Sequence, residues 1–103
     1  MVMKNLLLAV LLPITMTYAE PAPPEAAICA GCHGTEGISA SDMFPNLAGQ
    51  KAGYLESSLK AFRAKERTGN NANMMIPIAA SLSDKDISTL AAYFASISLT
   101  PEQ

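Results

Sequence analysis

The chain has 103 residues, which is enough for one small domain. Seven Lys and Arg residues against nine Asp and Glu residues give a formal net charge of −2. That balance argues against nucleic acid or an anionic membrane surface as a partner. The composition includes only two cysteines and one histidine, and all three lie within residues 29–33.

The N-terminal segment has the organisation of a secretory signal peptide. Lys4 supplies a positive charge, an unbroken apolar run occupies residues 6–12, and Thr17-Tyr18-Ala19 places small residues where a signal peptidase reads the chain. The run is shorter than the ~20 residues that a membrane-spanning helix requires. We therefore expect a signal peptide at residues 1–19 and a periplasmic domain at residues 20–103, with no stable membrane insertion after cleavage.

The expected mature chain is small for an independent fold. Without Lys4 it carries six basic and nine acidic residues, a net charge of −3 over 84 residues. Domains of this size rarely bury enough apolar surface on their own, and they usually need a disulfide, a metal or a cofactor.

The first half of the mature chain predicts two helices joined by a loop. A short helix is expected from about Glu25 to His33, with Pro24 suited to its first position and Gly34 to its end. Residues 35–49 are rich in turn-forming residues and predict a loop. From about Lys51 to Lys65 the apolar residues recur at helical spacing, at Tyr54, Leu55, Leu59 and Phe62.

The second half predicts an apolar loop and a final helix. Pro77 favours an extended conformation at Ile76, so residues 74–77 are expected to be a loop that packs on another part of the molecule. Ser83 is an N-cap candidate for the final helix, which Thr100-Pro101 would end. The apolar positions of that helix are Ile87, Leu90, Ala91, Phe94 and Ile97. No segment shows a strand pattern, so the expected fold class is all-α.

The segment Cys29-Ala-Gly-Cys-His33 carries the chemistry. Residues three and four apart share one face of a helix, so Cys29, Cys32 and His33 form one surface. Two thiols at this separation can add across the two vinyl groups on one edge of a haem, and the adjacent imidazole can reach the iron. This spacing is the attachment signature of c-type haem. A covalent haem would also supply the apolar core that the small chain lacks.

Other possible functions of these three residues have less support. A structural zinc site needs four protein ligands, and the chain offers three His and Cys residues in total. A thioredoxin-like dithiol belongs in a βαβ context, which the sequence does not predict. A disulfide between Cys29 and Cys32 would close a very short loop and stabilise little.

The second axial position on the iron has three candidates. No second His exists, so the candidates are the methionines outside the signal peptide, Met43, Met74 and Met75. A thioether opposite a His is typical of electron-transfer cytochromes, in which it raises the reduction potential. We expect residues 74–77 to cross the distal face as an extended loop, which favours Met74 or Met75 over Met43.

At this point the sequence resembles the class I c-type cytochromes, and within them the small cytochrome c4/c553-like group. The resemblance covers nearly all of the mature chain and depends on Cys29–His33, Phe44–Gln50 and Met75–Phe94. It implies a small class I cytochrome c fold, with three to four short helices around one covalent haem. Lys65 stands where the group commonly has Gly.

The resemblance also implies roles for individual residues. In this group the axial Met lies seven residues before the Leu of a Leu-Ser-Asp sequence, which selects Met75, with Met74 second. Pro45 matches the residue whose carbonyl accepts a hydrogen bond from the axial His. The residues expected to pack against the ring are Leu47, Tyr54, Leu59 and Ile78, and Arg67 is the candidate for a haem propionate.

The expected function is one-electron transfer between a donor and an acceptor redox protein, without catalytic turnover. His33 and Met75 would be the metal ligands, and Cys29 and Cys32 the covalent attachment points of one haem c. One alternative is a dedicated haem subunit of a periplasmic oxidoreductase complex. Others are a haem protein that binds an exogenous ligand at an open sixth position, and a haem-free thiol oxidoreductase.

Overall fold

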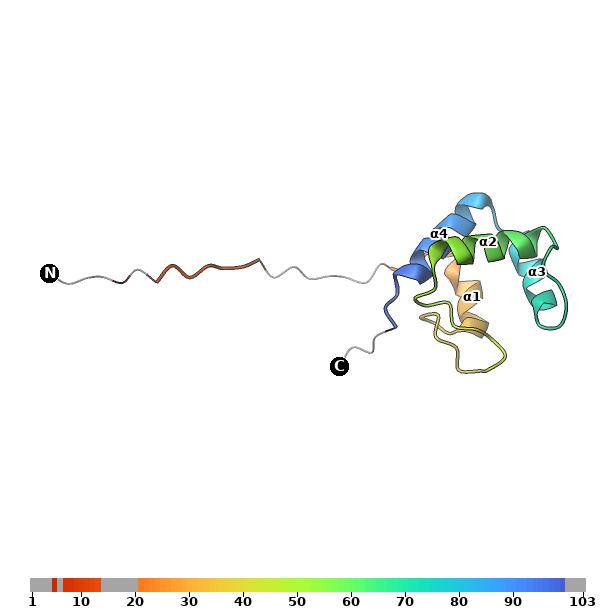
Figure 1. The fold of residues 1–103 in the computed structure, drawn as a ribbon, viewed down its shortest axis with the longest axis horizontal. Coiled ribbons are helices and arrows are strands. Elements are labelled where there is room, and N and C mark those ends of the chain that lie inside the picture. Colours follow the sequence, from red (N-terminus) through yellow and green to blue (C-terminus); the bar gives the residue numbers. More distant parts are fainter. Residues whose placement is uncertain (1–4, 6, 14–20, 100–103) are drawn as a thin grey trace.

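The computed structural model describes residues 5, 7–13 and 21–99, and its regular secondary structure consists of α-helices. In chain order these are α1 (Ala26–His33), α2 (Ala52–Arg63), α3 (Ala72–Ala80) and α4 (Asp84–Ser96) (Figure 1). No strand occurs among these described residues. The predicted all-α class is therefore confirmed.

The core forms around the apolar face of α4. Its side chains at helical spacing pack against α2 and against the first residue of α1, and α2 also packs against α3. The buried cluster consists of Ala26, Leu55, Leu82, Ile87, Leu90, Ala91 and Phe94. The apolar positions expected to face the core from the last helix are thus correct from Ile87 to Phe94, and Ile97 is half-buried beside them.

Helix α1 is as short as the sequence predicted. It begins at Ala26, so Pro24 precedes the N-cap residue Glu25 and does not occupy the first helical position. It ends at Gly34, whose φ of 90° and ψ of 150° are open only to glycine. A Cβ at Gly34 would lie 2.0 Å from the carbonyl oxygen of Ile38, so the next loop can pass directly over the end of α1.

The loop between α1 and α2 is held closed at Gly37. The carbonyl oxygen of Gly37 accepts hydrogen bonds from the N–H groups of Leu47, at 2.8 Å, and of Ala48, at 3.0 Å. Gly37 has a φ of 76°, and a Cβ there would lie 2.9 Å from the Phe94 ring on α4. The N–H of Gly49 donates to the carbonyl oxygen of Phe94 at 2.9 Å. These contacts hold both ends of the loop against α4.

The expected extended loop at residues 74–77 is wrong, because the structure forms α3 there with Pro77 inside it. Proline lacks the N–H that would bond to the carbonyl of Asn73, and a proline in a helix interior costs about 3 kcal/mol. Ala79 is fully buried and α3 packs along α2, so burial outweighs the local preference. Pro77 itself is exposed, where its ring contacts solvent.

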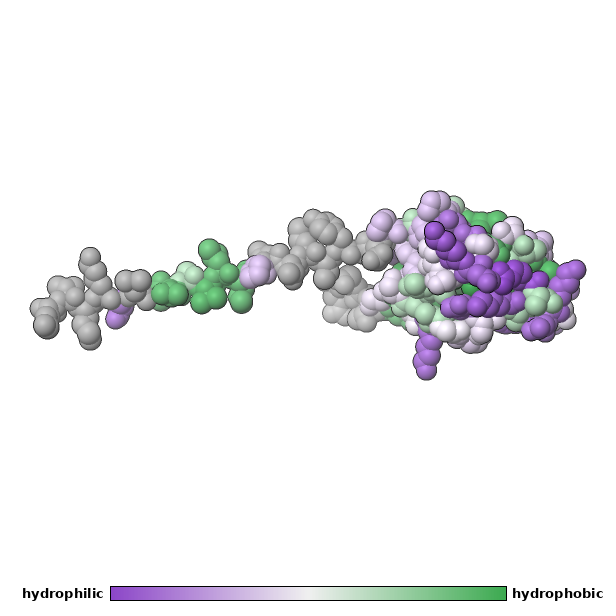
Figure 2. All heavy atoms as spheres, turned by 90° about the horizontal axis from the view of Figure 1, so that it is seen from above, coloured by the Kyte–Doolittle hydropathy of each residue, from purple (hydrophilic) through white to green (hydrophobic). Residues whose placement is uncertain are grey.

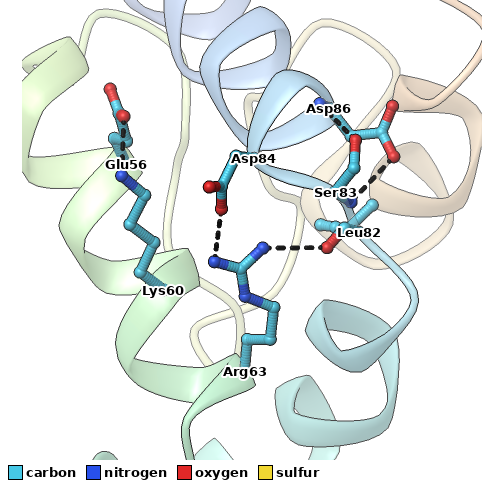
Figure 3. Close-up of polar contacts among 7 residues, drawn as sticks. All are labelled: Glu56, Lys60, Arg63, Leu82, Ser83, Asp84 and Asp86. Atoms are coloured by element: carbon cyan, nitrogen blue, oxygen red, sulfur yellow. Dashed lines mark hydrogen bonds and ion pairs between the residues drawn. The ribbon is translucent and has the colours of Figure 1, made fainter.

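The start of α4 is fixed by a capping box and by an arginine from α2 (Figure 3). The Ser83 hydroxyl accepts from the Asp86 N–H, and the Asp86 carboxylate accepts from the Ser83 N–H, both at 3.0 Å. Arg63 donates to the Leu82 carbonyl at 3.1 Å and to the Asp84 carboxylate at 2.5 Å. The end of α2 is thereby tied to the beginning of α4.

The described part of the N-terminal segment, residues 7–13, has no regular secondary structure. Its large apolar side chains are exposed, and the apolar segment lies away from the helical body in Figure 2. In the described residues, no helix has the length and apolar character needed to cross a membrane. Lys4 and the proposed cleavage site at Ala19 lie outside the described residues. The expected end of the last helix at Thr100-Pro101 is wrong, because α4 ends at Ser96 and the backbone of Ile97 is already extended.

Replacing Gly37 with Ala should destabilise the protein by about 1–3 kcal/mol, because the new Cβ meets Ala48 and Phe94 and the positive φ is strained. Denaturant unfolding of the haem-loaded protein measures this loss. Gly53→Ala is the control, since a Cβ at Gly53 on α2 meets nothing within 4 Å. Equal stability of Gly37→Ala and wild type would contradict the role given to Gly37.

Asp84 should make stability depend on pH. The hydrogen bond from Arg63, helped by its charge, lowers the pKa of Asp84 below its ordinary value. A lowered folded-state pKa contributes stability above the unfolded pKa, and this is lost as pH falls through the folded value. Asp84→Asn should therefore unfold at lower denaturant than wild type at neutral pH, and the difference should shrink on acidification. Asp42→Asn is the control, because Asp42 lies on the exposed loop and forms no ion pair with the described residues.

Candidate functional site

A cavity of about 370 Å³ opens among α1, the loop that follows it, α2 and α3, with α4 contributing its inner wall. This volume is in the range of sites that hold small molecules and cofactors. Its lining includes every site residue suggested by the sequence: Cys29, Cys32, His33, Pro45, Leu47, Tyr54, Leu59, Arg67, Met75 and Ile78. Residues from Ile28 to Phe94 thus meet around one space.

Two thiols stand on the α1 wall of this cavity. Cys29 is half-buried and Cys32 is exposed, and neither forms a disulfide in the structure. Burial raises the pKa of the Cys29 thiol above its ordinary value, so its sulfur is protonated and neutral at neutral pH. The three-residue separation places both sulfurs along one edge of the cavity, as attachment to two vinyl groups requires.

His33 is buried at the end of α1 and is oriented by the following loop. Its Nδ1 lies 2.7 Å from the carbonyl oxygen of Pro45. A carbonyl oxygen can only accept, so Nδ1 carries a proton and donates it; in the neutral ring this tautomer leaves the lone pair on Nε2. His33 is 6% exposed, and its ring meets Phe44 edge-on at a centroid distance of 6.1 Å. The ring is therefore oriented with Nδ1 toward Pro45 and Nε2 on the opposite side of the imidazole.

The loop positions Phe44 and Pro45 through the closure at Gly37. Because Gly37 bonds to Leu47 and Ala48, the chain must return beside the end of α1 just after Pro45. Neither Gly37 nor Phe44 is identifiable as a site residue from the sequence pattern alone. Phe44 could have been suggested by its position next to Pro45, in the segment that carries the family resemblance. The hydrogen bonds of Gly37 could not have been predicted from the residue types.

Helix α3 presents two adjacent methionines to the cavity. Consecutive residues on an α-helix point about 100° apart, so Met74 and Met75 cannot face the same way. Met75 is half-buried, whereas Met74 is 47% exposed. Met75 shares a helix face with Ile78 and the fully buried Ala79, which are three and four residues later. Met43, on the loop, also lines the cavity but is 57% exposed.

Arg67 reaches the cavity through the turn that ends α2. Lys65 has a φ of 60°, in the left-handed region that favours glycine, and the N–H groups of Glu66 and Arg67 return to the Ala61 carbonyl. The Arg67 guanidinium lies 4.6 Å from the centroid of the Phe62 ring. This geometry explains why a Gly at the position of Lys65 would suit the same turn.

The other predicted wall residues differ in exposure. Leu47, Leu59 and Ile78 are half-buried, whereas Tyr54 is 53% exposed at the edge of the cavity. Further lining residues, which sequence reasoning assigned to helix packing or did not single out, are Leu55, Ser58, Phe62, Leu90, Ala91 and Phe94. The walls are therefore mostly apolar, and they offer two thiols and one oriented imidazole, which fits a covalently attached haem.

A metal site built from protein side chains alone requires several ligating side chains close together. Within the described residues, no group of three or more His, Cys, Asp or Glu side chains is arranged to hold a metal ion. The zinc alternative requires four such ligands.

Comparison with known proteins agrees with this geometry. The family model described as cytochrome c matches residues 26–98, which include all four helices. Cytochrome c-554(548) of Halomonas halodenitrificans is 53% identical over 68 residues, which are 66% of this chain and 82% of that protein. Cytochrome c4 of Pseudomonas aeruginosa is 36% identical over 101 residues, which are 91% of this chain and 49% of that protein.

Solved structures show the same fold. Reduced recombinant cytochrome c4 from Pseudomonas stutzeri superposes with a TM-score of 0.62 at 39% identity, over 68% of this chain and 38% of that one. The thiosulfate dehydrogenase TsdBA from Marichromatium purpuratum superposes with a TM-score of 0.66 at 39% identity, over 69% of this chain and 15% of that one. The chain thus spans half or less of the length of several proteins that it matches.

The matched region contains the two cysteines and the histidine of the attachment segment, together with the whole cavity wall. The class I cytochrome fold expected from the sequence is confirmed. The chain belongs to the cytochrome c family and is a haem electron carrier with one haem c attached through Cys29 and Cys32.

Proposed function

We propose that this chain is a periplasmic single-haem electron carrier in which His33 and Met75 are the two axial ligands of the iron. The observation that carries the proposal is the hydrogen bond from His33 to Pro45 at the wall of the cavity, which leaves Nε2 free to bind a metal. Met75 supports it as the least exposed of the three methionines that line the same cavity.

The residues of the chain perform three tasks around the cofactor. Pro45 fixes the tautomer and orientation of the His33 ring, so that its lone pair is presented without reorganisation. Met75 contributes a thioether sulfur from α3, which favours the reduced state. Arg67, stacked on Phe62 at the cavity edge, is placed to pair with a haem propionate.

The bound haem supplies a one-electron change between ferric and ferrous iron. If His33 and Met75 both hold the iron, no coordination site would be left for a substrate, which accords with electron transfer and not catalysis. The half-buried side chains of Leu47, Leu59 and Ile78 limit the access of water to the ring. An apolar surrounding also keeps reorganisation small when the charge on the iron changes.

The location of the protein follows from its N-terminus. The proposal takes residues 1–19 as a signal peptide and residues 20–103 as the mature domain, which the family match at residues 26–98 accommodates. Its donor and acceptor are then other redox proteins outside the cytoplasm.

A second candidate function is that of a haem subunit or dedicated acceptor for a dehydrogenase. The superposition on TsdBA favours it, as does 39% identity over 69 residues to a thiosulfate dehydrogenase electron acceptor of Stutzerimonas stutzeri. That relative is about three times longer, since the match covers 32% of it. Stable co-elution of the tagged chain with a dehydrogenase would favour this candidate over a free carrier.

Replacing Met75 with Ala should remove the weak far-red absorption band of the sulfur–iron bond and lower the reduction potential, since the thioether stabilises ferrous iron. The reduced variant should also bind carbon monoxide, which wild type should not. Optical spectra in both redox states measure these changes. Met74→Ala is the matched control and should keep the band. Loss of the band in Met74→Ala alone would assign the ligand to Met74.

Expression of the full chain with haem-maturation machinery should yield a periplasmic protein that begins at Glu20 and carries the mass of one haem. Ala19→Arg should block cleavage, because the peptidase accepts only small residues there. Intact mass of the periplasmic fraction measures both outcomes. A haem-loaded protein that retains residues 1–19 in wild type would contradict the proposed boundary.

A further inference from the structure

The hydrogen bond to Pro45 fixes one atom of the His33 ring but not the plane of the whole ring. The distance of 2.7 Å to the Pro45 carbonyl oxygen sets the place of Nδ1. Rotation of a histidine ring about its Cβ–Cγ bond has broad energy wells, and a hydrogen bond loses little when it bends by about 30°. A second contact is therefore needed to define the plane of the imidazole and the direction of Nε2.

The Phe44 ring makes such a contact. Its centroid lies 6.1 Å from that of the His33 ring, and the two ring planes meet at 65°. Aromatic pairs prefer this edge-on arrangement, because the positive edge of one ring meets the negative face of the other. Among the described residues, Phe44 is the only aromatic side chain in ring contact with His33. A rotation of the imidazole away from its present plane would break this arrangement.

The backbone joins Phe44 and Pro45 stiffly. Proline restricts the residue before it to extended conformations, and its own ring fixes its φ. On one side of the pair, the Phe44 N–H donates to the Ser41 carbonyl at 3.2 Å. On the other side, the Asn46 side chain accepts from the Ser39 N–H at 2.6 Å. The loop therefore presents the Phe44 ring and the Pro45 carbonyl to the imidazole as one unit.

The imidazole is also protected from water. His33 is 6% exposed, although most residues of the loop at residues 35–50 are exposed. Phe44 is one of the half-buried side chains of this loop, and it lies against the imidazole. A proton in a hydrogen bond exchanges with water only when the bond opens and water reaches it. The apolar ring of Phe44 is thus placed to oppose both events at Nδ1.

We propose that Phe44 is a positioning residue for His33, whose ring holds the plane of the imidazole and keeps water from the hydrogen bond between Nδ1 and Pro45. The inference rests on the proposed function, in which Nε2 of His33 binds the haem iron. Two consecutive residues then divide one task, because Pro45 selects the tautomer and Phe44 defines the ring plane. A ligand held in this way is already oriented in both oxidation states of the iron.

The single histidine makes the test direct, because isotope-labelled histidine reports only on His33. Nitrogen NMR of the reduced, haem-loaded protein measures exchange of the Nδ1 proton with water, and the haem methyl shifts of the oxidised protein report the planes of the axial ligands. Phe44→Leu and Phe44→Met keep an apolar side chain without a ring. Both should speed proton exchange by at least about threefold, since opening costs less without the ring pair, and should change the pattern of methyl shifts. Phe44→Tyr, which keeps the ring, should behave as wild type.

Two controls separate this role from a general loss of stability. Ile87→Val weakens the core at a fully buried residue that does not line the cavity, and Met43→Leu changes the residue before Phe44. Both should keep the exchange rate and the methyl shifts of wild type. Wild-type behaviour of the two ringless variants, or equal acceleration in Ile87→Val, would overturn the role of Phe44. A wild-type Nε2 resonance at the position of a metal-free imidazole would instead contradict ligation by His33, and with it the proposed function on which the inference rests.

Discussion

The hydrogen bond from His33 Nδ1 to the Pro45 carbonyl depends on a chain of backbone constraints that begins at the end of α1. Gly34 adopts a conformation open only to glycine, so the chain can turn directly after His33. Gly37 then binds Leu47 and Ala48 and presses against Phe94 on α4. The carbonyl that orients the imidazole is therefore fixed by the core of the protein, and the orientation of the His33 ring is set by the protein itself.

Helix α3 forms the opposite wall of the cavity, although its sequence is locally unfavourable for a helix. Helix α3 includes Pro77 against its own backbone preference, and it is retained because Ala79 and the packing on α2 bury apolar surface. The helix points Met74 and Met75 about 100° apart. The difference in exposure between these two methionines thus follows from the tertiary packing of a helix that local rules disfavour.

The features that depend directly on residue type and spacing could be predicted from the sequence. Three helices and the attachment segment have clear patterns, and all ten suggested site residues line one cavity. It failed at residues 74–77, because the rule for the residue before proline is local and the helix is stabilised by distant packing. It also missed Gly37 and Phe44, since a turn-rich loop does not reveal which carbonyl it presents or which ring it places beside a histidine.

The central claim is that one methionine sulfur, that of Met75, completes the coordination begun by His33. The most direct test is a proton–carbon NMR spectrum of the reduced holoprotein, labelled at its methionine methyl groups and assigned with Met43→Leu and Met74→Leu variants. A methyl group held against the haem ring is shifted far upfield by the ring current. The account predicts that a single methyl is shifted in this way and that it persists in both variants. Absence of any such methyl, or its loss in either variant, would contradict the account.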